Sequence, residues 1–174
     1  MDQTSINSNQ GNQTALSVTA PNSQSVDTFS VTGSNGSVGF AVSAAGDQTT
    51  VKGNLKVQNI QEEFATLTGA TGTVTHNCDV QNIFYHTSPA ADFTVNITNL
   101  TLIGGNATTV SLIIAQGATA YIPTAVQIGG VAQTLNWQGG SAPSGTNSGI
   151  DVVSLSILNN GGTYIVLGQL VGFG

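Results

Sequence analysis

Short runs in which apolar and polar residues alternate dominate residues 64–174, and glycine or asparagine ends most of them. Alternation at every second residue places one side of a β-strand against a core and the other toward solvent. Val153, Leu155 and Ile157 share one strand face in this way. The pattern predicts strands at 64–68, 72–76, 80–86, 92–99, 107–115, 119–122, 125–128, 131–137, 150–158 and 163–171. The chain is therefore expected to be all-β.

Glycine pairs separate several of these expected strands. Gly104-Gly105, Gly129-Gly130 and Gly161-Gly162 all supply residues that tolerate the positive φ of tight hairpin turns. Many short strands joined by such turns are typical of β-sandwiches and jelly rolls. About 110 residues can bury a small core without help. We therefore expect residues 64–174 to form a C-terminal antiparallel β-sandwich of jelly-roll type.

The N-terminal third has a different character. Residues 1–25 are polar, have no long apolar periodicity and include a break at Pro21, which predicts an extended arm. Residues 26–63 hold short strands with narrow apolar faces, and three copies around an axis would bury what one copy cannot. We expect a short trimeric β-stalk here. Residues 61–66, with the sequence QEEFAT, are the only plausible helical turn.

Charge is scarce and unevenly placed. Only 6% of the residues are charged, arginine is absent, and Lys52 and Lys56 are the only basic residues. Nucleic-acid binding draws its affinity from Lys and Arg that neutralise phosphates, so a nucleic-acid partner is excluded. Binding to an anionic membrane surface is disfavoured for the same reason, and no apolar run is long enough to span a bilayer.

Ser, Thr, Asn, Gln and Gly make up just over half of the chain. Such side chains can hydrogen bond to one another across an interface, and no charge has to be removed from water. The composition therefore indicates assembly with further copies of the chain.

One group of side chains has the chemistry of metal ligands. It consists of His76, Cys78, Asp79 and His86, and the spacing of two between His76 and Cys78 puts both on one strand face. Zinc accepts His and Cys ligands, and a threefold axis would triple their number. The alternative is a buried thiol with two histidines that hydrogen bond inside the sheet. We expect no metal and no cofactor, and a single cysteine allows no internal disulfide.

Hydrolytic chemistry needs paired carboxylates, or a nucleophile with a base and an orienting group. The acids of residues 64–174 are Asp79, Asp92 and Asp151, and they are scattered along the sequence. Asp92 follows Pro-Ala-Ala as a turn residue, and Asp151 marks the start of a strand. We expect no catalytic residues and no enzymatic activity.

Sugar binding is the better candidate for a site. Lectin-type sites combine an aromatic platform with amide or acid groups nearby. Trp137 is flanked by Asn136 and Gln138, a long glycine-rich loop follows it, and Tyr85 and Tyr121 are further aromatic candidates. The alternative role for Trp137 is packing at a strand end. The candidate contact set for a host-surface glycan is therefore these five residues.

Two stretches resemble known proteins. Residues 47–58, DQTTVKGNLKVQ, are similar to the T-V-x-G-N-L-x-V repeats of bacteriophage fibre shafts, in which three chains intertwine. The stretches HNCDVQNIFYHTSPAADFTVNITNL, TAVQIGGVAQTLNWQGG and DVVSLSILNNGGTYIVLGQLVGFG resemble the terminal domain of virion structural proteins of marine phages, especially those of cyanobacteria. Together these resemblances extend from residue 47 to residue 174, a span of about 130 of the 174 residues.

The resemblance implies a homotrimeric virion appendage, a short fibre on tail, neck or head. It implies a protein that is made in the bacterial cytoplasm, joins the particle through residues 1–25 and has a distal domain that contacts the host surface. It carries over no active site. Two alternatives remain open: a capsid decoration or cement protein, and a monomeric carbohydrate-binding module.

Overall fold

The computed structural model of the chain describes residues 29–32, 38–42, 49–51 and 54–174. The chain divides into two compact units, residues 1–60 and 61–174. This division falls three residues before the boundary expected between stalk and terminal domain. The predicted arm, residues 1–25, lies outside the described residues.

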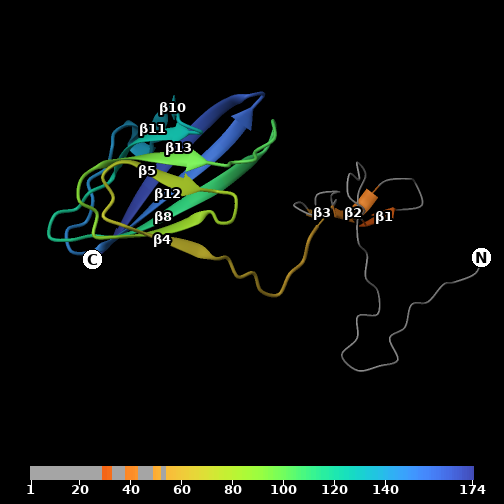
Figure 1. Ribbon diagram of the computed structural model, residues 1–174, viewed down its shortest axis with the longest axis horizontal. Helices are drawn as coiled ribbons and strands as arrows, with labels where there is room; N and C mark the ends of the chain where they lie inside the picture. Colours follow the sequence, from red (N-terminus) through yellow and green to blue (C-terminus); the bar gives the residue numbers. More distant parts are fainter. Residues whose placement is uncertain (1–28, 33–37, 43–48, 52–53) are drawn as a thin grey trace, which may run out of the picture. The chain divides into compact units, whose positions relative to one another are not determined.

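The first unit contains a small antiparallel sheet. Its strands are β1 (Phe29–Thr32), β2 (Val38–Val42) and β3 (Thr49–Val51), and their order in the sheet is β1-β2-β3 (Figure 1). Phe40 of the central strand pairs with Val31 on one side and Val51 on the other. These strands fall inside the predicted stalk, so strand formation there is confirmed, while its association into a trimer stays a prediction.

The second unit consists of two sheets. Its strands are β4 (Phe64–Thr68), β5 (Gly72–Asn77), β6 (Ile83–Thr87), β7 (Phe93–Thr98), β8 (Ala107–Ala115), β9 (Pro123–Ile128), β10 (Val131–Gln133), β11 (Leu135–Trp137), β12 (Ile150–Asn160) and β13 (Thr163–Phe173). One sheet has four strands in the order β10-β9-β7-β5, and the other has six in the order β11-β13-β12-β8-β6-β4. Among the described residues the only helical segment is a single 3-10 turn, Gln138–Gly140.

The chain alternates between the two sheets as it advances from β4 to β9. The six-stranded sheet takes β4, β6 and β8, and the four-stranded sheet takes β5, β7 and β9. Neighbours of the same sheet are parallel in all four pairs. Each pair of consecutive strands is therefore one rung of a coil, and the three rungs stack to form a short two-sheet β-solenoid. In such a coil each rung buries its apolar side chains only with the help of its neighbours.

The turns between the sheets stack as well as the strands. The amide of Ala90 donates to the carbonyl of Ala70 at 2.9 Å, and the amide of Cys78 donates to that of Thr98 at 2.9 Å. Backbone groups at the corners therefore find partners on the next rung, which buried or half-buried turns require. The rungs are joined along the solenoid at the corners as well as along the strands.

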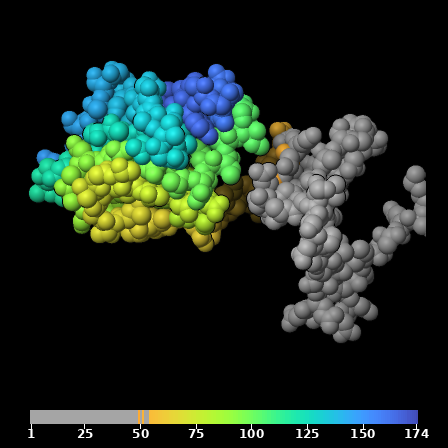
Figure 2. Space-filling model, turned by 45° about the horizontal axis from the view of Figure 1, so that its top comes forward, coloured from red at the N-terminus to blue at the C-terminus, as the bar shows by residue number. Residues whose placement is uncertain are grey.

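A C-terminal hairpin closes one end of the coil. Strand β12 pairs antiparallel with β8, and β13 pairs antiparallel with β12 through all eleven residues of each strand (Figure 1). The two-residue turn Gly161-Gly162 has φ values of 62° and 95°, which glycine adopts without strain. Its neighbour Asn159 exchanges backbone hydrogen bonds with Gly105 and Asn106, so the hairpin tip lies beside the 99–106 connection, as Figure 2 shows.

One core lies between the two sheets. Its fully buried side chains come from both sheets and from every rung, and the largest are Phe84, Phe93, Ile97, Leu112, Ile114, Leu155 and Ile157. Strand β7 shows the cause, because its burial alternates strictly and Phe93, Val95 and Ile97 are inside. The polar side chains buried among the described residues are His76, His86 and Asp151.

The expected all-β class is confirmed, but the expected antiparallel pairing is wrong for β4 to β9. Antiparallel pairing occurs in β12, β13 and the small β9–β10 hairpin. The jelly-roll connectivity is likewise not what the structure shows. Alternation reports only that one strand face is buried, and it is the same for parallel and antiparallel neighbours. The short connections suggested hairpins, whereas most of them cross to the opposite sheet.

Three local expectations also need correction. Residues 119–122 form a loop before β9, not a strand. The segment 61–66 enters β4 and forms no helical turn. Gly104-Gly105 lies in a crossover from β7 to β8, which belong to different sheets, so it is not a hairpin turn. The predicted hairpins at Gly129-Gly130 and Gly161-Gly162 are confirmed.

Candidate functional site

The structure brings three of the five predicted glycan-contact residues together. Asn136, Trp137 and Gln138 line a shallow depression of about 370 Å³ at the junction of β11 and β13. Its other lining residues are Ser154, Ser156, Leu167, Gly168 and Gln169. The amide nitrogen of Asn136 donates to the carbonyl of Val166 at 3.1 Å. That amide group is thus held in place by the sheet edge.

The indole of Trp137 is used for packing. Gly168 is opposite Trp137 in the parallel β11–β13 ladder, and a Cβ at Gly168 would lie 2.9 Å from Trp137 Cε3. Gly168 is on the buried side of β13 together with Val166, so the ring covers the core side of this strand. Leu135 approaches the same position from the same strand. A sugar platform needs an aromatic face that is open to solvent, and this arrangement instead favours the packing role.

The two tyrosines lie elsewhere. Tyr85 is in β6 and makes an edge-to-face contact with Phe64, with ring centroids 6.3 Å apart. Tyr121 is in the loop before β9, where its backbone amide and carbonyl bond the side chain of Gln116 at 3.0 and 2.9 Å. Neither tyrosine lines the depression at Trp137.

The loop 138–149 is anchored by a carboxylate that the sequence did not single out as important. Asp151 is fully buried, and its oxygens accept hydrogen bonds from the amide of Thr146 at 2.9 and 3.2 Å and from Gln116 Nε2 at 2.8 Å. The amide of Ala120 donates a further hydrogen bond to Asn147 Oδ1 at 2.9 Å. A buried carboxylate needs such donors, because an unpartnered one is costly. Asp151 therefore holds the loop against the end of the solenoid.

Two histidines meet in the core from opposite sheets. His76 is in β5 and His86 is in β6, and their Nε2 atoms are 2.9 Å apart. Phe93 stacks on the His86 ring at a centroid distance of 5.1 Å, and Phe84 makes an edge contact with the His76 ring at 4.8 Å. The pair is thus a polar bridge between the two sheets inside an aromatic shell.

The hydrogen bonds determine the protonation of this pair. His76 Nδ1 is 2.9 Å from the carbonyl of Val74 and must carry a proton in order to donate to it. In the neutral ring, His76 Nε2 is then the acceptor, and His86 Nε2 donates to it. The remaining nitrogen, His86 Nδ1, is an acceptor. Among the side chains that the structure describes, it is the one buried polar atom without a hydrogen-bond partner.

Burial keeps both histidines neutral. The pKa of His76 is lowered from 6.5 to about 4, mainly by desolvation and also by the neighbouring His86, against an opposing effect of the Val74 carbonyl. Desolvation also lowers the pKa of His86 to about 4. A second charge inside this core would repel the first at 2.9 Å. These histidines therefore serve the fold in their uncharged form.

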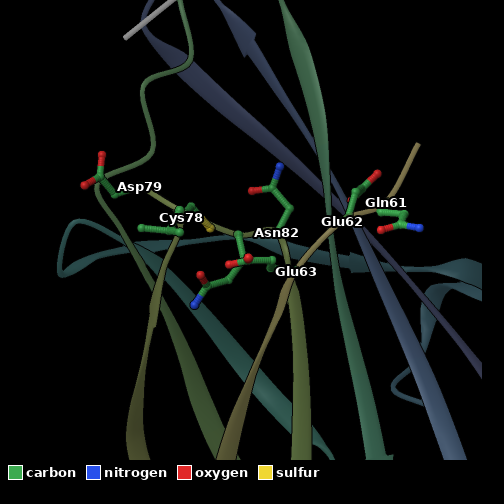
Figure 3. A pocket seen from close by; sticks show the side chains of 8 residues that line it. Gln61, Glu62, Glu63, Cys78, Asp79 and Asn82 are labelled. Atoms are coloured by element: carbon green, nitrogen blue, oxygen red, sulfur yellow. The ribbon is translucent and has the colours of Figure 1, made fainter. Parts of the chain in front are cut away.

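The four side chains considered as metal ligands do not form one cluster in the described part of the chain. Cys78 lies just beyond β5 at the edge of a depression of about 510 Å³, which Glu62, Glu63 and Asp79 also line. Figure 3 shows Asp79 and Glu62 on opposite sides of it. Burial raises the pKa of the Cys78 thiol to about 11, so the thiol keeps its proton. No group of three or more His, Cys, Asp or Glu side chains arranged to bind a metal occurs among the residues that the structure describes.

Comparison with known families, curated proteins and solved structures finds no significant match to this chain. In the described part of the chain, no helix has the length and apolar character to cross a bilayer.

Replacement of Trp137 by alanine tests the packing role. We expect Trp137→Ala to lower the free energy of unfolding by about 2–3 kcal/mol, because a half-buried indole and its contacts over Gly168 are lost. Gln138→Ala is the control, since this exposed side chain lines the same depression and should change stability by less than about 0.5 kcal/mol. Urea unfolding followed by far-UV circular dichroism measures both. Unchanged stability of Trp137→Ala would show that the indole is free for a ligand.

The histidine pair predicts acid-sensitive stability. Both pKa values are near 4 in the folded chain and near 6.5 when unfolded, so the unfolded state binds more protons between these values. Stability is fully present above about pH 6.5 and falls with decreasing pH, by up to about 1.4 kcal/mol per unit for each histidine. Urea unfolding at pH 7.5, 6 and 5 measures this slope.

The double variant His76→Gln/His86→Gln is the matched control for that slope. Glutamine keeps donors and acceptors in the core but does not titrate. The free energy of unfolding of this variant should therefore not change between pH 6.5 and pH 5. A wild-type chain whose stability is constant from pH 7.5 to 5 would contradict the assignment.

Proposed function

We propose that this chain is a non-enzymatic structural protein of a bacteriophage virion, a short homotrimeric fibre of tail, neck or head. Residues 1–25 join it to other virion proteins, and residues 26–63 form the trimeric stalk. Residues 64–174, called the β-domain below, are distal and contact the host surface. The sequence similarity of 47–58 to fibre-shaft repeats supports the stalk. The resemblance of the C-terminal stretches to phage virion proteins supports the setting.

The observation that carries the proposal is the charge-poor surface of the β-domain. Residues 64–174 contain three charged side chains, and one of these, Asp151, is buried and fully bonded. Asp92 accepts a hydrogen bond from the amide of Ile122 at 2.9 Å. Apart from Asp79 and Asp92, the side chains on the surface of residues 64–174 are hydroxyl, amide, glycine and apolar groups. Such a surface packs against a further copy without the cost of removing charges from water.

The fold supports a structural role in a second way. Stacked rungs with hydrogen-bonded corners make a unit in which each rung is held by the next. Three such domains on one stalk would present three identical distal surfaces. Weak contacts at each surface then add up to useful avidity for a host cell.

The mass of the full chain in solution tests the trimer. Light scattering on a size-exclusion column should give about 53 kDa, which is three times the chain mass of 17.6 kDa, and this value should persist on tenfold dilution. A mass of one chain at every concentration would contradict the trimer. It would favour the decoration protein, which assembles only on a capsid, or the monomeric carbohydrate-binding module.

A further inference from the structure

We infer that the outer face of the six-stranded sheet is the surface on which copies of this chain meet. The outer face is defined as the side of this sheet that points away from the core. Its outward residues on the long hairpin are Ile150, Val152, Ser154, Ser156, Leu158, Ile165, Leu167, Gln169, Val171 and Phe173. This inference rests on the proposed self-association and identifies the surface that carries it.

The alternation of burial assigns these side chains to the outside. In β12, Val153, Leu155 and Ile157 are fully buried, so their neighbours in sequence must point the other way. In β13 the same holds for Val166 and Gly168 against their neighbours. The outer face is thus a direct consequence of which residues fill the core.

The outer face is unusually apolar for a free surface. Thirteen large hydrophobic side chains are exposed among the described residues, and seven of them lie on this face: Phe64, Ile150, Leu158, Ile165, Leu167, Val171 and Phe173. Phe173 is 57% exposed and Leu167 is 47% exposed. Large contiguous apolar patches on soluble proteins mark interaction sites.

The register joins the apolar side chains into a row across the sheet. Val171 pairs with Val152, Val152 with Ile113, and Ile113 with Tyr85, so one apolar row runs over β13, β12, β8 and β6. Side chains opposite one another on adjacent strands are in contact distance. A scatter of single exposed hydrophobics needs no explanation, but a continuous row of this kind does.

A second row on the same face is polar and uncharged. Gln169 pairs with Ser154, and Ser154 pairs with Ser111. Hydroxyl and amide groups both donate and accept, so this row can bond to its own copy in another chain. The charged residues of the β-domain are absent from the face, because Asp79 and Asp92 lie in connections between strands and Asp151 points into the core.

This chemistry fits a second copy better than a foreign protein. Where this face lies against a threefold axis, the residues nearest the axis meet their own copies. A charged patch would repel itself there, whereas apolar and hydroxyl rows tolerate that contact. Five neighbouring strands at about 4.8 Å and a mean length near 8 residues at about 3.3 Å give an area of roughly 650 Å². This is close to the ~800 Å² that each partner buries in a standard interface.

The test compares one charge on the outer face with one charge on the opposite side of the domain. Val152→Asp places a carboxylate in the apolar row of the central strand β12. Thr94→Asp is the matched control, because Thr94 is equally half-buried and points outward from β7, a central strand of the four-stranded sheet. We expect the Val152→Asp oligomer to dissociate toward 17.6 kDa on dilution, because only the short stalk then joins the copies, whereas Thr94→Asp should keep the wild-type mass at the same concentrations. Circular dichroism verifies that both variants are folded.

Hydroxyl-radical footprinting of the wild-type chain supplies a readout that needs no variant. Phe173, Leu167 and Val171 should react several-fold more slowly than Val131 and Ile103, which are exposed to a similar degree but lie off the face. Protection should be lost in Val152→Asp. An oligomeric wild type in which the outer face reacts as fast as Val131 overturns the inference and leaves the proposed trimer standing. A mass of two chains together with a protected outer face would contradict the proposed trimer and leave the inference standing.

Discussion

The core shared by the two sheets constrains everything else in the β-domain. Strands β4 to β9 alternate between the sheets, so every rung must supply inward side chains to the same space. No rung has a core of its own, and a gap in one rung would expose its neighbours. The His76–His86 hydrogen bond spans this space between the sheets, and burial keeps both rings uncharged. The hairpin β12–β13 then covers the last rung and completes the burial.

Alternation in the sequence was sufficient to locate most strands and the inward residues of each, because it reports burial of one face directly. It did not indicate which strands are neighbours in a sheet. A partial signal of the solenoid is the spacing of its first two rungs, since β4 and β6 begin at Phe64 and Ile83 and β5 and β7 begin at Gly72 and Phe93. The third rung breaks this spacing, because β8 and β9 begin only at Ala107 and Pro123. A period near 20 residues is typical of coiled β-repeats. Residues 119–122 were misplaced because a short apolar run before Pro123 resembles a strand in composition alone.

The candidate sites differ in how far the sequence could identify them. Asn136, Trp137 and Gln138 are adjacent in sequence, so their proximity was certain, but only Gly168 in a distant strand shows that the indole faces the core. His76 and His86 stood out in the sequence only as members of a candidate metal cluster with Cys78 and Asp79, and the structure places the two histidines against each other in the core. The sequence did not indicate that the residues of the outer face form one surface. Its rows join residues from β6, β8, β12 and β13, which only the register brings together.

We infer that chains associate through the outer face of the six-stranded sheet. An experimental structure of the full chain in its solution assembly, by cryo-electron microscopy or crystallography, tests it most directly. The account predicts three copies whose six-stranded sheets face a common axis, with Val152 and Phe173 buried between chains. Single copies, or copies that meet through the four-stranded sheet with Val152 and Phe173 left in solvent, would contradict it.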